Sequence, residues 1–331
     1  MSASSLAHSR RADLPGILAA FAGIYLIWGT TYLAIAISIQ TVPPFIGGSA
    51  RFLLAGLLMW AWLRLRSPRP FAGLNWPMAA LCGVLLSGIG NGFVIWAQQG
   101  IPSGVAALIV AAMPVLVLVL DWAFFSRQAP RGQAVIGVAI AIAGVTLIVL
   151  HTRSLSGSAQ PMHLLAMLAA VTGWSLGTLQ QKKAATAQTV LSFTCAQMIA
   201  GGLFQFVLSF LDREWDHFDP GAVSLASLLA LVYLVVFGSM VALNCYLWLL
   251  TRVSAQKVTT YALVNPVVAL ILGALILNER VSGLAVLAAV LVLAGVTLVL
   301  FQDVGPALRA RLMRLRSGPP GAAKACKVNA E

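Results

Sequence analysis

Apolar residues run along this chain in long stretches, and short polar breaks separate one stretch from the next. A helix of about 20 residues rises roughly 30 Å, which is the thickness of the hydrocarbon core of a bilayer. The runs are unbroken rather than alternating with a period of two, which excludes a transmembrane β-barrel. The sequence predicts ten membrane-spanning helices, at residues 15–38, 44–63, 77–97, 103–125, 132–150, 162–181, 190–211, 222–249, 255–277 and 282–301.

The pattern of the first five helices recurs in the last five. Pro114 lies near the middle of the fourth run, and Pro266 follows 152 residues later in the ninth. Gly144 and Gly295 are 151 residues apart, and each begins a Gly-Val-Thr-Leu segment. Three further pairs keep a similar spacing: Trp28 with Trp174, Arg51 with Gln197, and Trp96 with Trp248. Because five is an odd number of spans, the second unit must run upside down relative to the first.

The predicted fold is therefore an all-α integral membrane protein made of two inverted five-helix repeats. We place the first repeat at 15–150, a linker at 151–161 and the second repeat at 162–301. A polar segment, 1–14, precedes them, and a basic tail, 302–331, follows. Inverted repeats are the architecture of alternating-access transporters, because two similar halves can exchange conformations.

Composition supports the membrane assignment and predicts an orientation. Of 331 residues, 60% are hydrophobic and 9% are charged, against about 45–50% and 25% in soluble domains. The net charge is +12, and most of the basic residues lie in the two terminal segments and in the breaks on the same side of the membrane. The positive-inside rule then predicts cytoplasmic termini, a periplasmic linker and a multi-pass protein of the inner membrane. Anionic lipid accounts for the basic excess, so we expect no nucleic-acid partner.

No pattern in the sequence indicates a cofactor, a metal site or an enzyme. The chain has no P-loop, serine nucleophile elbow, zinc-ligand spacing or dinucleotide fingerprint. Its four cysteines give no disulfide framework. A membrane-embedded enzyme acting on lipid is the alternative from another class, but it would need a cluster of His, Asp or Ser at one depth. The sequence contains no such constellation.

Several weak motifs, in a fixed order, resemble one transporter family. They are Trp28-Gly29, Pro44 followed by Arg51-Phe52, the mid-helix prolines Pro114 and Pro266, the Asn278-Glu279-Arg280 turn, and the paired Gly-Val-Thr-Leu endings. Together they resemble the drug/metabolite transporter superfamily, specifically its ten-helix EamA-type exporters with two EamA repeats. The resemblance covers residues 16–301.

This resemblance implies a transporter with a central cavity lined by helices from both halves. It implies export of small metabolites, amino acids or drug-like compounds, with import or exchange of a polar solute as the alternative. The family often has a glutamate after the fourth helix as well as after the ninth. Here the position 152 residues before Glu279 is Arg127, so a symmetrical role for two glutamates is not expected.

Arg51 is the sharpest candidate for contact with the substrate. An arginine at the centre of a membrane helix costs at least about 2.5–3.5 kcal/mol on insertion scales, so it should face protein or water. One interpretation is a docking point for a substrate carboxylate, which the guanidinium fork can hold through two hydrogen bonds. The other is a structural arginine that binds loop carbonyls at the helix ends.

Two carboxylates are candidates for proton coupling. Asp121 is the only carboxylate inside a predicted span, and burial would raise its pKa towards the working range. The alternative is a position at the membrane interface beside Arg127 or Arg131. Glu279 lies in a tight turn, where a solvated ion pair or a helix-end contact is the alternative to coupling.

Aromatic, amide and proline residues complete the candidate set. A mid-membrane proline frees a backbone carbonyl, and such breaks often line a transport pathway. Amides bind either substrate or neighbouring helices, and tryptophans form apolar cavity walls. Besides Arg51, the predicted substrate-binding residues are Trp28, Thr31, Asn91, Pro114, Trp174, Gln197, Asn244, Tyr261, Asn265 and Pro266. The expected partners are a small-molecule substrate, the lipid bilayer and, through the two carboxylates, protons.

Overall fold

A computed structural model describes residues 14–156, 161–184, 186, 189–253, 258, 260–279 and 281–301. The predicted N-terminal segment apart from its last residue, positions 157–160 of the linker, and the tail at 302–331 lie outside the described residues. Within the described ranges the regular structure is helical, without strands. The all-α prediction is confirmed.

Ten spans are formed, nine by long apolar helices and one by a shorter helix, in the part of the chain that the structure describes. In chain order the spans are α2 (Leu14–Ser38); α3 (Pro44–Arg66); α4 (Trp76–Cys82), η1 (Gly83–Asn91) and α5 (Gly92–Ala97); α6 (Ser103–Ala111), α7 (Met113–Leu120) and η2 (Asp121–Ser126); α8 (Gly132–Ser156); α9 (Pro161–Ala184); α10 (Val190–Leu211); α11 (Leu225–Tyr233), η5 (Leu234–Val241) and α12 (Ala242–Arg252); α14 (Tyr261–Ile276); and α15 (Gly283–Leu300). Two short 3-10 helices, η3 (Glu214–Asp216) and η4 (Pro220–Ala222), connect α10 to α11.

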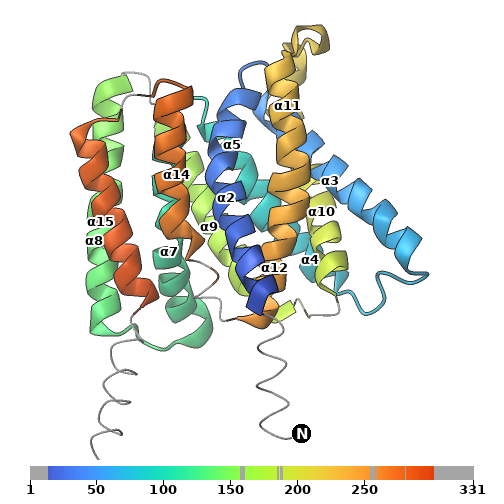
Figure 1. Ribbon diagram of the computed structural model, residues 1–331, viewed down its shortest axis with the longest axis horizontal. Helices are drawn as coiled ribbons and strands as arrows, with labels where there is room; N and C mark the ends of the chain where they lie inside the picture. The colour runs from blue at the N-terminus through green and yellow to red at the C-terminus, as the bar shows by residue number, and fades with distance from the viewer. Residues whose placement is uncertain are drawn as a thin grey trace, which may run out of the picture.

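Helices of the first repeat pack against their counterparts in the second. The most extensive contacts join α8 to α15 and α3 to α10, and α6 packs against α14. The α8–α15 pair forms one edge of the bundle, and α3 slants outward at the opposite edge (Figure 1). Large apolar side chains on the outer helix faces are exposed, for example Leu54, Leu203 and Val290. Such side chains suit contact with lipid rather than water.

Glycines set the distance between the paired helices. A Cβ added at Gly295 would lie 2.5 Å from the backbone nitrogen of Ala141, and one added at Gly144 would lie 2.8 Å from that of Val292. In the other pair, a Cβ at Gly202 would lie 2.9 Å from the backbone nitrogen of Leu53. Small residues allow such close backbone approach between membrane helices.

Among the residues that the structure describes, three spans contain π-helical turns, which the sequence pattern did not predict. Two of them, η1 at Gly83–Asn91 and η5 at Leu234–Val241, interrupt the third and eighth spans at matching places in the two repeats. The third, η2, ends the fourth span. A π-helical turn holds an extra residue, and such turns occur frequently at functional sites.

The connections divide between two ends of the bundle. Helix α2 begins and α15 ends at the same end (Figure 1), which also carries the α7–α8 connection. We call it the Gln128 end. The opposite end carries the α10–α11 and α14–α15 connections, and we call it the Glu279 end.

Replacing Gly295 by alanine tests the close packing of α8 on α15. The added methyl group would meet the backbone of Ala141, and overpacking of this kind costs about 1–3 kcal/mol. We expect the Tm of the purified protein in detergent to fall. Gly283→Ala is the matched control in the same helix, because nothing lies within 4 Å of its added Cβ. An unchanged Tm for Gly295→Ala would contradict the backbone contact.

Candidate functional site

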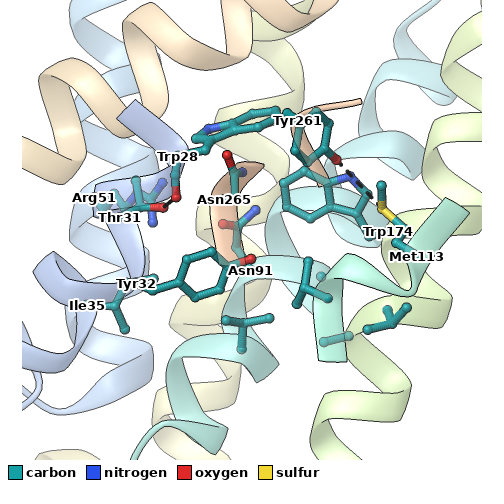
Figure 2. A pocket seen from close by; sticks show the side chains of 15 residues that line it. Trp28, Thr31, Tyr32, Ile35, Arg51, Asn91, Met113, Trp174, Tyr261 and Asn265 are labelled. Atoms are coloured by element: carbon teal, nitrogen blue, oxygen red, sulfur yellow. Dashed lines mark hydrogen bonds between the residues drawn. The ribbon is translucent and has the colours of Figure 1, made fainter. Parts of the chain in front are cut away.

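A small cavity lies at the centre of the bundle, between the two repeats. Its volume is about 50 Å³. Figure 2 shows Arg51, Thr31 and Tyr32 on one side, the amides of Asn91 and Asn265 in the middle, and Trp174 and Tyr261 on the other side. The residues that line it are Trp28, Thr31, Tyr32 and Ile35 of α2; Arg51 of α3; Gly90, Asn91 and Val94 of the third span; Val110 and Met113 of the fourth; Ala170, Val171 and Trp174 of α9; and Tyr261 and Asn265 of α14.

Arg51 places a buried positive charge on the cavity wall. The side chain is 2% exposed, and its Nε donates a hydrogen bond to Ser239 Oγ at 2.8 Å. The guanidinium lies 4.7 Å from the centre of the Phe52 ring. One terminal nitrogen, Nη1, is buried without a hydrogen-bond partner. A buried charge that lacks partners is costly, so this group is poised to bind an anion.

Arg51 also lines a second, smaller hollow towards the Glu279 end. This hollow has a volume of about 10 Å³ and is bounded by the α2–α3 connection, by Gly47 and Gly48 of α3, and by Leu231 and Leu234. The guanidinium therefore belongs to the wall between the central cavity and one end of the bundle.

Four aromatic rings from different helices meet at the cavity. Trp28 lies 5.8 Å from Trp174, 5.2 Å from Tyr246 and 4.8 Å from Tyr261, measured between ring centroids. The pairs with Trp174 and Tyr261 are edge-to-face, which is a favourable arrangement for aromatic rings. The Trp28 indole N–H donates to the Gly238 carbonyl in η5 at 3.3 Å. The wall is thus a rigid apolar surface that joins both repeats.

The amide nitrogens of two cavity residues already donate hydrogen bonds within the protein. Asn91 Nδ2 donates to the Leu86 carbonyl within η1 at 3.1 Å. In the orientation that satisfies its surroundings, Asn265 Nδ2 donates to the carbonyls of Tyr261 and Tyr25, each at 3.2 Å. The Tyr261 carbonyl lies four residues before Asn265 and one turn below Pro266. The amide oxygens are then available to accept hydrogen bonds from a ligand.

Seven of the eleven predicted substrate-binding residues line this cavity: Trp28, Thr31, Arg51, Asn91, Trp174, Tyr261 and Asn265. Pro114 and Pro266 are not among the lining residues, but each directly follows one in sequence, Met113 and Asn265. Gln197 is buried elsewhere and shares a 2.8 Å hydrogen bond with Gln181. Asn244 donates to the Met240 carbonyl at 2.6 Å. The last two amides therefore join helices or helix turns.

Sequence reasoning did not find Tyr32, Ile35, Val94 and Met113 as lining residues. Three of them are apolar, and Tyr32 shares a run of apolar residues with no local signal of a cavity. Spacing could have found Tyr32 and Ile35, because they lie four and seven residues after Trp28 and so share its helix face.

The two predicted coupling carboxylates lie away from the cavity lining. Asp121 begins η2 near the Gln128 end, and its side chain is partly exposed. Glu279 lies at the opposite end, where Oε1 accepts from the Ser103 N–H at 2.8 Å and Oε2 from the Gly104 N–H at 3.3 Å. It therefore caps the N-terminus of α6. This is the helix-end contact that was the alternative for this residue.

A second carboxylate makes the same kind of contact at the same end. Glu214, in η3, accepts from the N–H groups of Phe45 and Ile46 at 2.8 and 2.7 Å and so caps the N-terminus of α3. Burial raises the pKa of Glu214 to about 7, with a small contribution from nearby Asp212, although the two amide hydrogen bonds oppose the shift. The sequence placed Glu214 only in an acidic loop cluster.

A larger hollow of about 510 Å³ opens between α3, α5, α9 and α10. Its lining is mostly apolar, and it contains none of the predicted substrate-binding residues. Trp96 at its rim donates to Asp212 Oδ2 at 3.0 Å and stacks on His163. The central cavity is the candidate site because it combines a buried charge, amides and aromatic rings.

Comparisons with known proteins agree with this architecture. Residues 14–150 and 161–301 each match the sequence model of the EamA-like transporter family. The chain is 36% identical over 293 residues to the uncharacterized inner membrane transporter YedA of Escherichia coli K12, covering 86% of this chain and 90% of YedA. It is 27% identical to a probable amino-acid metabolite efflux pump of the same organism, covering 86% of this chain and 94% of the pump. A solved crystal structure aligns with a TM-score of 0.61 at 19% identity, over 86% of this chain and 97% of its own, which supports the fold.

The raised pKa of Glu214 predicts how stability depends on pH. A carboxyl group whose pKa is about 7 in the folded protein holds its proton more tightly there than in the unfolded chain. Its contribution is fully present below the unfolded pKa near 4.5 and is lost as pH rises through about 7. We expect the Tm to fall across this range in the native protein and less in Glu214→Gln.

The matched control for this experiment is Asp219→Asn, which removes another carboxylate of the same connection. Asp219 caps only its own short helix, through the Gly221 N–H at 2.8 Å. Identical pH profiles for the native protein and Glu214→Gln would contradict the assignment.

Proposed function

Because the chain belongs to the EamA-like transporter family, and is thus a multi-pass membrane transporter rather than an enzyme, we propose that it is a secondary active exporter. Its proposed substrates are small metabolites, amino acids or drug-like compounds. It would carry them across the inner membrane by alternating access, with the two repeats rocking about the central cavity. The observation that carries this proposal is the cavity between the repeats, with the partly unsatisfied guanidinium of Arg51 on its wall.

The proposed binding mode uses three parts of the cavity wall. Arg51 receives a carboxylate, because its unpaired Nη1 can complete a charge-assisted hydrogen bond. The oxygens of Asn91 and Asn265 accept from an ammonium or hydroxyl group beside it. The apolar body of the substrate packs against Trp28 and Trp174. A ligand with one carboxylate and an apolar or aromatic body fits this arrangement, which accords with the relative named as an amino-acid metabolite efflux pump.

The size of the cavity supports a mechanism with moving halves. At about 50 Å³ it is well below the roughly 300–1,000 Å³ of a typical small-molecule site. The conformation described is therefore contracted, and substrate must enter as helices of the two repeats separate. The broken spans supply the adjustable parts, since α6 and α7 meet just before Pro114 and α14 contains Pro266.

The proposed orientation places both termini in the cytoplasm and the Glu279 end in the periplasm. The basic residues Arg64, Arg66 and Arg127 lie at the ends of helices that reach the Gln128 end, as the positive-inside rule requires. Export then runs from the Gln128 end, through the central cavity and past Arg51. Import or exchange would use the same cavity, and gradients imposed in opposite directions distinguish these modes.

Arg51→Ala tests the binding mode. Cells or vesicles are loaded with a labelled metabolite mixture, and efflux is compared between the native protein and the variant at matched membrane levels. A hydrogen bond to a charged group contributes about 1.5–3 kcal/mol, so we expect roughly 10- to 100-fold weaker apparent affinity for carboxylate-bearing substrates. Arg51→Gln should retain the contact with Ser239 yet show the same selective loss.

The control for this experiment is Arg213→Ala, which removes an arginine whose side chain is 80% exposed. Its efflux should match that of the native protein. If carboxylate-bearing and neutral compounds lost efflux equally in Arg51→Ala, the carboxylate contact would be wrong. If no compound moved with the native protein under any gradient, the exporter proposal itself would fail.

Proton coupling is a separate part of the proposal. If Asp121 or Glu279 carries the coupling proton, Asp121→Asn or Glu279→Gln should abolish efflux against a concentration gradient while downhill exchange continues. The measurement is substrate efflux together with proton influx, recorded by a pH-sensitive dye in vesicles. Active efflux that survives both substitutions would exclude these carboxylates as coupling sites.

A further inference from the structure

Three non-glycine residues of the described chain have a left-handed backbone, and each is followed by Glu or Gln. They are Arg127, Arg213 and Asn278, with φ of 53°, 55° and 54°. Each lies one or two residues beyond the last residue of a helix that ends a span. A left-handed residue after a helix turns the chain back towards the helix end. The following residues are Gln128, Glu214 and Glu279.

The backbone conformation at these turns changes the expected pairing of residues between the repeats, from a spacing of 152 residues to one of 151. Asn278 and Arg127 share the left-handed conformation and lie 151 residues apart, the same spacing as Gly295 and Gly144. Gln128, rather than Arg127, is therefore the counterpart of Glu279. The expectation that a glutamate is missing after the fourth span holds, but its replacement is a neutral side chain of nearly the same shape.

The turn before Glu279 is built to bring its carboxylate onto α6. The N–H groups of Leu277 and Glu279 both donate to the Gly273 carbonyl, each at 3.1 Å. A Cβ at Gly273 would collide with the Glu279 carboxylate and would lie 2.9 Å from Ser103 Oγ. The carboxylate thus reaches the N-terminus of α6, where the helix dipole favours a negative charge.

The counterpart at the other end is not engaged. Gln128 is exposed, and its backbone N–H donates only locally, to Ser126 Oγ at 3.3 Å. Its side-chain amide binds no helix N-terminus in the part of the chain that the structure describes. Two equivalent turns in inverted repeats are therefore in different states, one closed on a helix and one open.

Glu279 joins two helices, α6 and α14, that have irregular backbone in or beside them. Helices α6 and α14 line the cavity, and each lies at or contains a proline break. The helices joined by Glu214, α3 and α10, lack an internal proline and make more extensive contact with each other than α6 makes with α14. Glu214 is thus a fixed clamp, whereas Glu279 bridges two parts of the cavity wall.

We propose that Glu279 is a gating residue, which holds the Glu279 end of the cavity closed by binding the N-terminus of α6. Opening that end requires release of the Ser103 and Gly104 N–H groups from its carboxylate. The equivalent turn at the other end carries Gln128, which lacks the charge and is exposed. This inference rests on the alternating access of the proposed function.

The gate is tested by measuring the distance between its two sides without substrate. Spin labels are placed at Gln99 and Val281, which are exposed at the Glu279 end on either side of the contact, and Cys245 and Cys326 are replaced by alanine. In Glu279→Gln we expect the ratio of long to short distances to rise by about tenfold.

Gly273→Ala provides a second route to the same result. It retains the charge of Glu279 but displaces its carboxylate, so the long-distance population should also rise. Glu214→Gln is the matched control. It weakens the same kind of helix-capping contact, between Glu214 and the N-terminus of α3, and should leave the distances unchanged. Native distances in both Glu279→Gln and Gly273→Ala would overturn the proposal. A rise in Glu214→Gln equal to that in Glu279→Gln would also overturn it, because the effect would then be general loosening.

Efflux measured on the same variants separates this inference from the proposed function. Changed distances together with altered efflux rates support the gate. If the distances change but the native protein transports nothing, the exporter proposal is wrong. The contact of Glu279 with α6 would then control the conformation without controlling transport. Unchanged distances in a protein that does export would remove the gate alone.

Discussion

Hydrocarbon offers no hydrogen bonds, so every backbone group that a membrane helix leaves unpaired must find a partner within the protein. This constraint explains where the helices of the protein are irregular. The π-helical turns η1 and η5 and the breaks at Pro114 and Pro266 all lie at or next to the central cavity. There the Leu86 and Gly238 carbonyls are bound by Asn91 and Trp28. In these spans the irregular backbone thus lies at or next to the cavity wall, whereas η2 lies near the Gln128 end.

The same constraint applies to charge. Arg51 is buried between the repeats with a serine hydroxyl and an aromatic ring as neighbours, rather than a carboxylate. An aspartate beside Arg51 would neutralise its charge and lower the free-energy cost of burying it. The paired guanidinium could then no longer select an anion. In the proposed binding mode, the unpaired Nη1 of Arg51 is what gives the cavity its preference for an anion.

Much of this architecture could be predicted from the sequence. Membrane spans appear there as long apolar runs, and the repeats appear as prolines and glycines at matching positions. Residues with a polar or aromatic signal, such as Trp28, Arg51 and Asn265, could be assigned to the cavity. Met113 could not, since nothing distinguishes a cavity-facing methionine from one that faces lipid. The π-helical turns were missed because an extra residue in a helix leaves the apolar pattern intact. The capping contacts of Glu214 and the turn before Gln128 were missed because they depend on backbone conformation, which hydropathy does not report.

The matching positions of η1 and η5 have a consequence for the side chains that follow them. An extra residue in one helix rotates everything beyond it by about 100°, because each residue of an α-helix turns by that angle. The third and eighth spans carry such turns at equivalent places, so the face that each span presents changes in the same sense in both repeats. An apolar face traced along either span from its first residue would therefore point to the wrong side beyond the turn.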